Sequence, residues 1–156
     1  MRRRRLGLLK VSTFVAVALG ILFVGEMSQA IAEGWLAAEE SAMTKHVNQH
    51  RQANGLKPLS SHSALKMVAR RQAQRMVLAG KIYHNPNLEA EADEAVPDWM
   101  ILGENVGVGP DEPSVHEAFL ASPAHRENIE LPDFNILGLG AMAGDDGSMY
   151  LSLIHI

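Results

Sequence analysis

The sequence lacks cysteine altogether and has few aromatic residues. Without cysteine among its 156 residues, the chain cannot form disulfides, zinc–thiolate sites or cysteine nucleophiles. Aromatic residues make up only 5% of the chain, whereas 47% of the residues are hydrophobic and 21% are charged. This composition is typical of one soluble globular domain and excludes collagen-like, coiled-coil and generally disordered chains.

Positive charge is scarce outside the N-terminal segment. Residues 1–32 carry five Lys or Arg against one Glu, a net charge of +4. Residues 33–156 carry nine Lys or Arg against 17 Asp or Glu, a net charge of −8. Because an acidic domain repels phosphate backbones, we expect no nucleic-acid partner.

The first 32 residues have the features of an export signal. Four arginines and Lys10 precede residues 11–25, which carry no charge and are short for a membrane span of ~20 apolar residues. Ala30 and Ala32 place small residues where a signal peptidase reads the chain. We therefore expect residues 1–32 to be a signal peptide, or alternatively an uncleaved anchor, and the domain to be secreted or held outside the membrane. An exported domain without disulfides is more bacterial than eukaryotic.

The remaining chain predicts a short linker over residues 33–41 and then two helices. The first helix is expected over residues 39–53, and the second begins after an N-cap at Ser60 or Ser61 and ends before Gly80. Three arginines of the second helix are expected on its solvated face: Arg70, Arg71 and Arg75.

The second half mixes a loop, helices and strands. Two prolines and five acidic side chains in residues 85–98 predict a long loop. Helical turns are expected over residues 114–121 and 124–130. Strands are expected over residues 101–108, 136–143 and 149–156, the last two joined by a hairpin turn. The sum is an α+β fold with a small antiparallel sheet.

Three short polar motifs stand at the edges of these elements. They are Tyr83-His84-Asn85-Pro86, Gly103-Glu104-Asn105-Val106, and Ser122-Pro123-Ala124-His125-Arg126 followed by Asn128-Ile129. Each motif alone is a weak signal, because a single histidine beside a strand is more often structural than a ligand. As a set, they supply the imidazoles of His84 and His125 and the carboxylate of Glu104. Two neutral imidazoles suit Zn²⁺ or Cu²⁺, and a carboxylate can orient one ring or take a third position.

In this order, and behind two such helices, the motifs resemble those of the CAP superfamily of cysteine-rich secretory, antigen 5 and pathogenesis-related proteins. More narrowly, the chain resembles the cysteine-free bacterial SCP-like domain over residues 42–150. The resemblance implies an α-β-α sandwich whose surface cleft is lined by two histidines and two glutamates. His84, Glu104 and His125 match three of those positions. The position of the second glutamate, three residues after Phe119, is occupied by Ser122.

Three functions remain open at this point. The first, which we favour, is a secreted, non-catalytic binding domain whose cleft holds a metal ion such as zinc, or a small ligand such as a lipid or peptide. His84 and His125 are then the metal ligands, with Glu104 as a third ligand or an orienting group. The second is a hydrolase of peptide or cell-wall substrates that uses metal-bound water, with the same three residues as catalytic candidates. The third is a structural surface module without a ligand.

Other polar residues have plainer explanations. Ser122 is expected to cap a turn rather than to act as a nucleophile. His46 and His50 lie one helical turn apart, a spacing that can bind metal, but a half-exposed helix face is the commoner use. His116 is expected to be exposed on the third helix. Trp99 can pack under the long loop or line the cleft as an apolar wall, and packing is the use that we expect.

The last six residues depart from the closing strand of the family. Their sequence is also the translation of one reading frame of a common transposase sequencing adapter, so we expect residues 151–156 to be an adapter remnant in place of the native last strand. The alternative is a genuine strand, because the alternating side chains of these residues can pair across the turn at 144–147.

Overall fold

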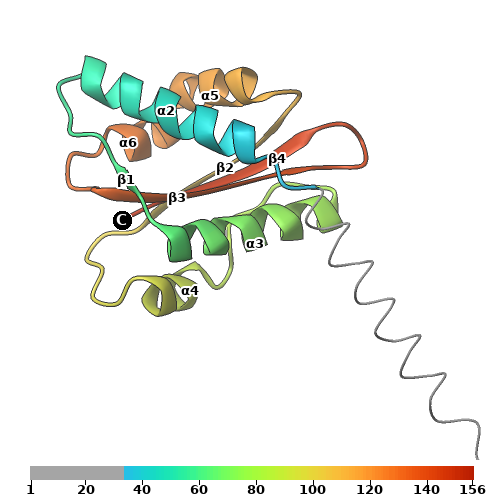
Figure 1. Ribbon diagram of the computed structural model, residues 1–156, viewed down its shortest axis with the longest axis horizontal. Helices are drawn as coiled ribbons and strands as arrows, with labels where there is room; N and C mark the ends of the chain where they lie inside the picture. Colours follow the sequence, from blue (N-terminus) through green and yellow to red (C-terminus); the bar gives the residue numbers. More distant parts are fainter. Residues whose placement is uncertain (1–33) are drawn as a thin grey trace, which may run out of the picture. The chain divides into compact units, whose positions relative to one another are not determined.

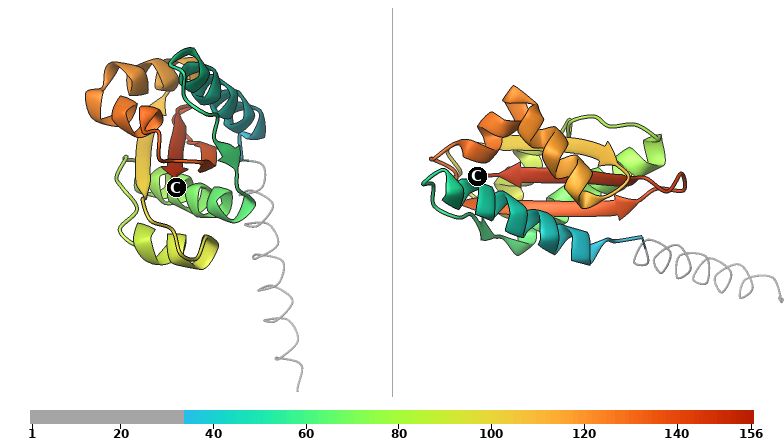
Figure 2. Two further views of the ribbon diagram at one scale, coloured as in Figure 1. Left: turned by 90° about the vertical axis from the view of Figure 1, so that its left-hand side faces the viewer. Right: turned by 90° about the horizontal axis from the view of Figure 1, so that it is seen from above.

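Helices cover both faces of one four-stranded sheet (Figure 1). The computed structural model describes residues 34–156, and the predicted signal segment lies outside them. One face of the sheet carries α2 (Ala37–Ala53), α5 (Glu112–Ala121) and α6 (Pro123–Glu130). The opposite face carries α3 (Ser63–Ala79) and α4 (Leu88–Ala95), as Figure 2 shows from the side. The predicted α-β-α sandwich is therefore confirmed.

The sheet has the strand order β1-β3-β4-β2. Its strands are β1 (Ser60–Ser61), β2 (Gly103–Gly109), β3 (Ile136–Ala143) and β4 (Met149–His155). The strands β2 and β3 both run antiparallel to β4, and β1 runs parallel to β3. As a result β4 is an inner strand and β2 forms an edge of the sheet.

Side chains alternate in direction along each strand, so the two faces of the sheet carry different residues. On the face toward α2, Leu139 and Leu153 lie opposite each other and pack with Met43, Val47 and Phe119 in the larger core cluster. On the face toward α3, two glycines of β3 allow close approach of that helix. A Cβ atom at Gly140 would lie only 2.3 Å from the backbone nitrogen of Arg70.

The structure corrects four local predictions. The segment 85–98 is not a continuous loop, because α4 lies within it. The second helix has His62 as its N-cap, while Ser60 and Ser61 form β1 instead. The predicted linker 33–41 is partly helical, since α2 begins at Ala37. Arg70 is not simply solvated: it donates two hydrogen bonds of 2.8 Å to the buried carboxylate of Glu40.

The C-terminal segment lies in the centre of the sheet. All seven residues of β4 are buried, and the strand pairs with both β2 and β3. This is the geometry of a genuine strand, while the adapter origin of residues 151–156 stays a prediction. Among residues 34–156, no helix is long and apolar enough to cross a membrane.

Candidate functional site

The three predicted site residues come from three different elements around the edge strand β2. Glu104 is the second residue of β2, His84 lies in the loop between α3 and α4, and His125 lies in the first turns of α6. The side chain of Glu104 lies on the α3 side of the sheet, where it meets His84. The next residue, Asn105, faces α6 on the other side because side chains alternate along a strand.

The carboxylate of Glu104 is buried, and both of its oxygens accept hydrogen bonds. Its Oε2 accepts bonds from Nδ1 of His84 at 3.0 Å and from the backbone N–H of Asn85 at 2.9 Å. Its Oε1 accepts a bond from the hydroxyl of Ser152 on β4 at 3.0 Å. The side chain of Glu104 is only 2% exposed, whereas that of His84 is 64% exposed. A fixed, buried carboxylate therefore orients an exposed imidazole ring.

His125 is held from the opposite side of the strand. The amide of Asn105 donates a hydrogen bond of 2.9 Å to the backbone carbonyl of His125, and Asn128 donates one of 2.9 Å to Oδ1 of Asn105. The ring of His125 packs against Phe119, with the ring centroids 5.0 Å apart. Burial, and then the nearby His84, lower the pKa of His125, so its ring is neutral at pH 7. Glu104 contacts His84 and not both histidines.

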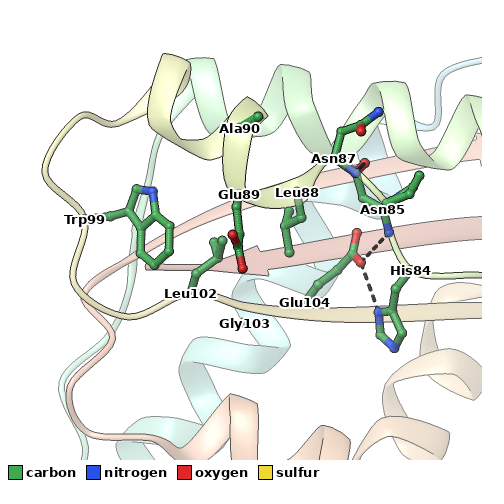
Figure 3. A pocket seen from close by; sticks show the side chains of 11 residues that line it. His84, Asn85, Asn87, Leu88, Glu89, Ala90, Trp99, Leu102, Gly103 and Glu104 are labelled. Carbon is green, nitrogen blue, oxygen red and sulfur yellow. Dashed lines mark hydrogen bonds and ion pairs between the residues drawn. The ribbon is translucent and has the colours of Figure 1, made fainter.

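A groove of about 830 Å³ runs from His84 along α4. Figure 3 shows His84 and Glu104 toward one end of this groove and Trp99 at the other, with Leu88 and Leu102 between them. Trp99 lines this groove and also packs against the core cluster that contains Ala92 and Ile154, so both predictions for it hold. Its indole N–H donates to Asp93 at 2.6 Å. The groove combines apolar walls with a polar end.

Two hydroxyl groups differ from what the sequence led us to expect. Ser122 occupies the N-cap position of α6, but its side chain makes no capping hydrogen bond within residues 34–156. The hydroxyl that reaches the site belongs to Ser152, which the motifs did not reveal. Ser152 lies opposite Val106, so it reaches Glu104 diagonally across the antiparallel pair. Only the strand register, which the sequence does not specify, brings these two residues together.

The donor set fits a metal ion only in part. Nε2 of His84 is on the far side of the ring from Glu104 and is available as a ligand, and His125 supplies a second imidazole. Both oxygens of Glu104 are already bonded, which makes it an orienting group and not a ready third ligand. Within residues 34–156, no three His, Cys, Asp or Glu side chains are gathered closely enough to form a ready-made metal centre.

The sandwich fold and the match to a protein family define the class of protein. The model of the cysteine-rich secretory protein (CAP) family matches residues 44–154, and the chain belongs to this family. An uncharacterized protein of Bacillus subtilis, YkwD, is 29% identical over 120 residues. That match covers 74% of this chain but only 46% of YkwD, so the chain spans less than half the length of this curated relative.

Solved structures share the fold. An outer surface protein of Borrelia burgdorferi has a TM-score of 0.71 at 17% identity, over 78% of this chain and 96% of that one. An extracellular SCP-domain protein of Bacillus anthracis has a TM-score of 0.67 at 20% identity, over 77% and 40% of the chains. A cysteine-rich secretory protein of Staphylococcus aureus has a TM-score of 0.66 at 22% identity, over 76% and 38%.

Proposed function

We propose that this chain is an exported, non-catalytic binding domain in which His84 and His125 hold a divalent metal ion such as Zn²⁺. The observation that supports this most directly is the hydrogen bond between His84 and the buried Glu104, which fixes Nδ1 and leaves Nε2 of an exposed ring free. A carboxylate behind an imidazole is the usual device for orienting a metal-binding histidine. The lowered pKa of His125 keeps its ring in the neutral form that binds metal.

Glu104 acts in this proposal as the positioning residue. Two imidazoles give a weak site, and water completes the coordination of the metal. The bound ion would supply a positive centre that attracts an anionic or carbonyl group of a ligand. The groove beside His84 is where the rest of such a ligand would lie.

The same contacts argue against the hydrolase alternative. A general base must have a carboxylate oxygen or imidazole nitrogen within reach of the attacking water. Three donors already occupy the carboxylate of Glu104, so it is poorly placed for that task. The hydroxyl bonded to Glu104 belongs to Ser152, which is fully buried and beyond the reach of a substrate.

Calorimetric titration of the full chain with Zn²⁺ tests the metal site. We expect His84→Ala and His125→Ala each to weaken the binding of Zn²⁺. The control is His62→Ala, at the N-cap of α3, which should leave binding unchanged. Glu104→Gln should weaken binding about 10–100-fold without removing a ligand. Equal binding by the wild type and the His84→Ala, His125→Ala double variant would reject the proposal.

A lipid or peptide in the groove is the second candidate. It is favoured by the apolar residues Leu88, Trp99 and Leu102, which form a wall beside the polar end. A fluorescent fatty acid and an unstructured peptide library serve as probes for the two ligand types. Trp99→Ala should reduce the binding of whichever probe the wild type binds. The control is Trp35→Ala, because Trp35 lies beside Met142 at the other end of the sheet, and it should leave binding unchanged. Unchanged binding in Trp99→Ala would exclude this groove.

Export of the domain is also part of the proposal. Two solved structures with this fold are named as an outer surface protein and an extracellular protein, and residues 1–32 have the pattern of an export signal. N-terminal sequencing of the protein recovered from medium and membrane fractions tests it. A new N-terminus near Glu33 in the medium supports a cleaved signal, and an intact N-terminus in the membrane supports an anchor. Recovery of the chain from the cytoplasm alone would contradict export.

A further inference from the structure

Three histidines that the CAP-type site does not use gather around a second hollow. His46 and His50 of α2 and His116 of α5 line a cavity of about 420 Å³ between the two helices. None of the residues that line this hollow also lines the groove beside His84. His116, which we expected to be exposed, is half-buried there.

Carboxylates already fix two of the three rings. Nδ1 of His46 lies 3.0 Å from both oxygens of Glu112, whose side chain is only 4% exposed. Nε2 of His50 lies 2.8 Å from Oε1 of Glu130. Because a carboxylate accepts the N–H of a neutral imidazole, the other nitrogen of each ring carries the lone pair. This is the pairing that orients histidines in metal sites.

Two of the three rings are spaced about as on one shared ion, although within residues 34–156 no three His, Cys, Asp or Glu side chains stand together as a ready-made metal site. His46 and His50 are four residues apart, the separation at which two histidines on one helix face bind the same metal. The ring centroids of His46 and His116 are 5.6 Å apart. With Zn–N bonds of about 2.0–2.1 Å, two imidazoles on one tetrahedral zinc ion have ring centres about 5 Å apart.

His116 brings an unsatisfied nitrogen to this place. Its Nδ1 is buried and has no hydrogen-bond partner in the described part of the chain. Burial lowers the pKa of His116, and the neighbouring His46 and His50 act in the same direction against the opposing effect of Glu112 and Glu117. The ring is therefore neutral at pH 7 and has a lone pair to offer. A buried imidazole nitrogen without a partner is costly unless it gains a ligand.

We propose that His46, His50 and His116 form a second metal site, between α2 and α5, for a divalent ion of the zinc or copper type. The three rings do not yet meet at one point. Binding therefore requires His116 to turn about its side-chain bonds, and His50 to turn away from Glu130 and Asn54, which its Nε2 now contacts. Both histidines face the hollow, which leaves room for that motion. Water or Glu117, which also lines the hollow, completes the coordination. Three imidazole ligands favour Cu²⁺ over Zn²⁺ in affinity.

The test uses the full chain, without a histidine tag, in a His84→Ala, His125→Ala background that removes the cleft site. We expect this background to retain one Cu²⁺ or Zn²⁺ ion per chain in equilibrium dialysis. His46→Gln or His116→Gln in that background should weaken the remaining binding at least about tenfold, and Glu112→Gln should weaken it about 10–100-fold. His62→Gln, at the N-cap of α3, is the matched control and should leave it unchanged.

A spectroscopic measurement guards against variants that fail to fold. The electron paramagnetic resonance spectrum of Cu²⁺ bound to the folded double-variant background should show coupling to imidazole nitrogens. That coupling should change in His50→Gln. Absence of stoichiometric binding in the background, or binding in His46→Gln and His116→Gln that is as tight as in the background, would overturn this second site. Either result leaves the cleft proposal to its own titration, since that titration depends on His84 and His125.

Discussion

The hydroxyl of Ser152 donates a hydrogen bond of 3.0 Å to Oε1 of Glu104, and it thereby links the inner strand β4 to the residue that orients His84. The other oxygen of Glu104 accepts from His84 and from the backbone of Asn85. Three donors from two separate segments, β4 and the loop between α3 and α4, thus converge on one buried carboxylate. The exposed imidazole at the mouth of the groove depends on this carboxylate for its orientation.

Replacing Glu104 should therefore destabilise the domain. We expect Glu104→Ala to lower the free energy of unfolding by about 1–3 kcal/mol, because it leaves buried donors without an acceptor. Urea denaturation measures the difference. Glu89→Ala, which removes an exposed carboxylate from the same groove, should change it by less than about 0.5 kcal/mol. Equal stability of the two variants would contradict the buried network and would also remove the support for a purely structural role.

The glycines of β3 give a second prediction. At Gly140 a Cβ atom would lie 2.3 Å from the backbone nitrogen of Arg70 and 2.5 Å from the backbone carbon of Ala69. Because helix backbone cannot move aside as a side chain can, Gly140→Ala should cost about 3 kcal/mol or more. Gly107→Ala is the matched comparison, since its new Cβ would meet only side-chain atoms of Val115 and Phe119. Thermal unfolding should rank the two variants in this order, and a reversed ranking would contradict the packing of α3 on β3.

Elements with strong apolar patterns were predictable from the sequence. The strand over residues 136–143 has the predicted bounds, because an apolar run with glycines ends at a polar turn. The short helix α4 was missed although it is rich in the helix-forming residues Leu, Ala and Glu, because the prolines and acidic side chains of residues 85–98 favoured a loop. Ala92 packs into the core under α3, and Glu91 pairs with Arg71 and Arg75. Local propensity does not report such tertiary support.

The sequence singled out the candidate site residues but not the hydrogen bonds between them. The motifs brought out His84, Glu104 and His125, and the structure places all three around β2. The sequence did not reveal Ser152, because a contact across two strands depends on their register. The sequence also did not show that Glu40 of α2 is buried and paired with Arg70 of α3, because a contact between two helices depends on how they pack in the fold.

Arg51 presents a buried charge that no carboxylate within residues 34–156 neutralises directly. Its guanidinium donates to the carbonyl groups of Lys57, Ile129, Leu131 and Phe134 over 2.7–3.3 Å. We expect Arg51→Met to lower the free energy of unfolding by about 3 kcal/mol or more, because four carbonyl groups lose their donor.

Arg51→Lys should also destabilise the domain, because an ammonium group cannot reach the same set of acceptors as the planar guanidinium. The control is Arg126→Met, at an exposed arginine that donates to a single carbonyl, that of Leu120. Urea denaturation of the three variants is the measurement. Loss of stability in Arg126→Met as large as in Arg51→Met would contradict a special role for the buried guanidinium.

His155 makes the stability of the domain depend on pH. The residue is fully buried, it stacks on Phe134, and neither ring nitrogen has a hydrogen-bond partner within residues 34–156. Burial, and then the charge of Arg51, lower the pKa of His155 from 6.5 to about 3. The unfolded chain therefore takes up a proton below pH 6.5 that the folded chain refuses until about pH 3.

As the pH is lowered from 6.5 toward 3, the free energy of unfolding should fall by about 1.4 kcal/mol per pH unit because of His155 alone. His155→Leu removes this contribution and places an apolar side chain in the buried site. The variant should therefore be more stable than the wild type, and the difference should grow as the pH is lowered from 6.5 to about 4. The smaller slope that remains is expected from His116 and His125, whose pKa values are also lowered. Urea denaturation at several pH values checks this, with His62→Leu as the control. If the free energy of unfolding had the same pH dependence in the wild type and in His155→Leu, His155 would take up its proton equally in the folded and unfolded chains. That result would contradict the burial of His155.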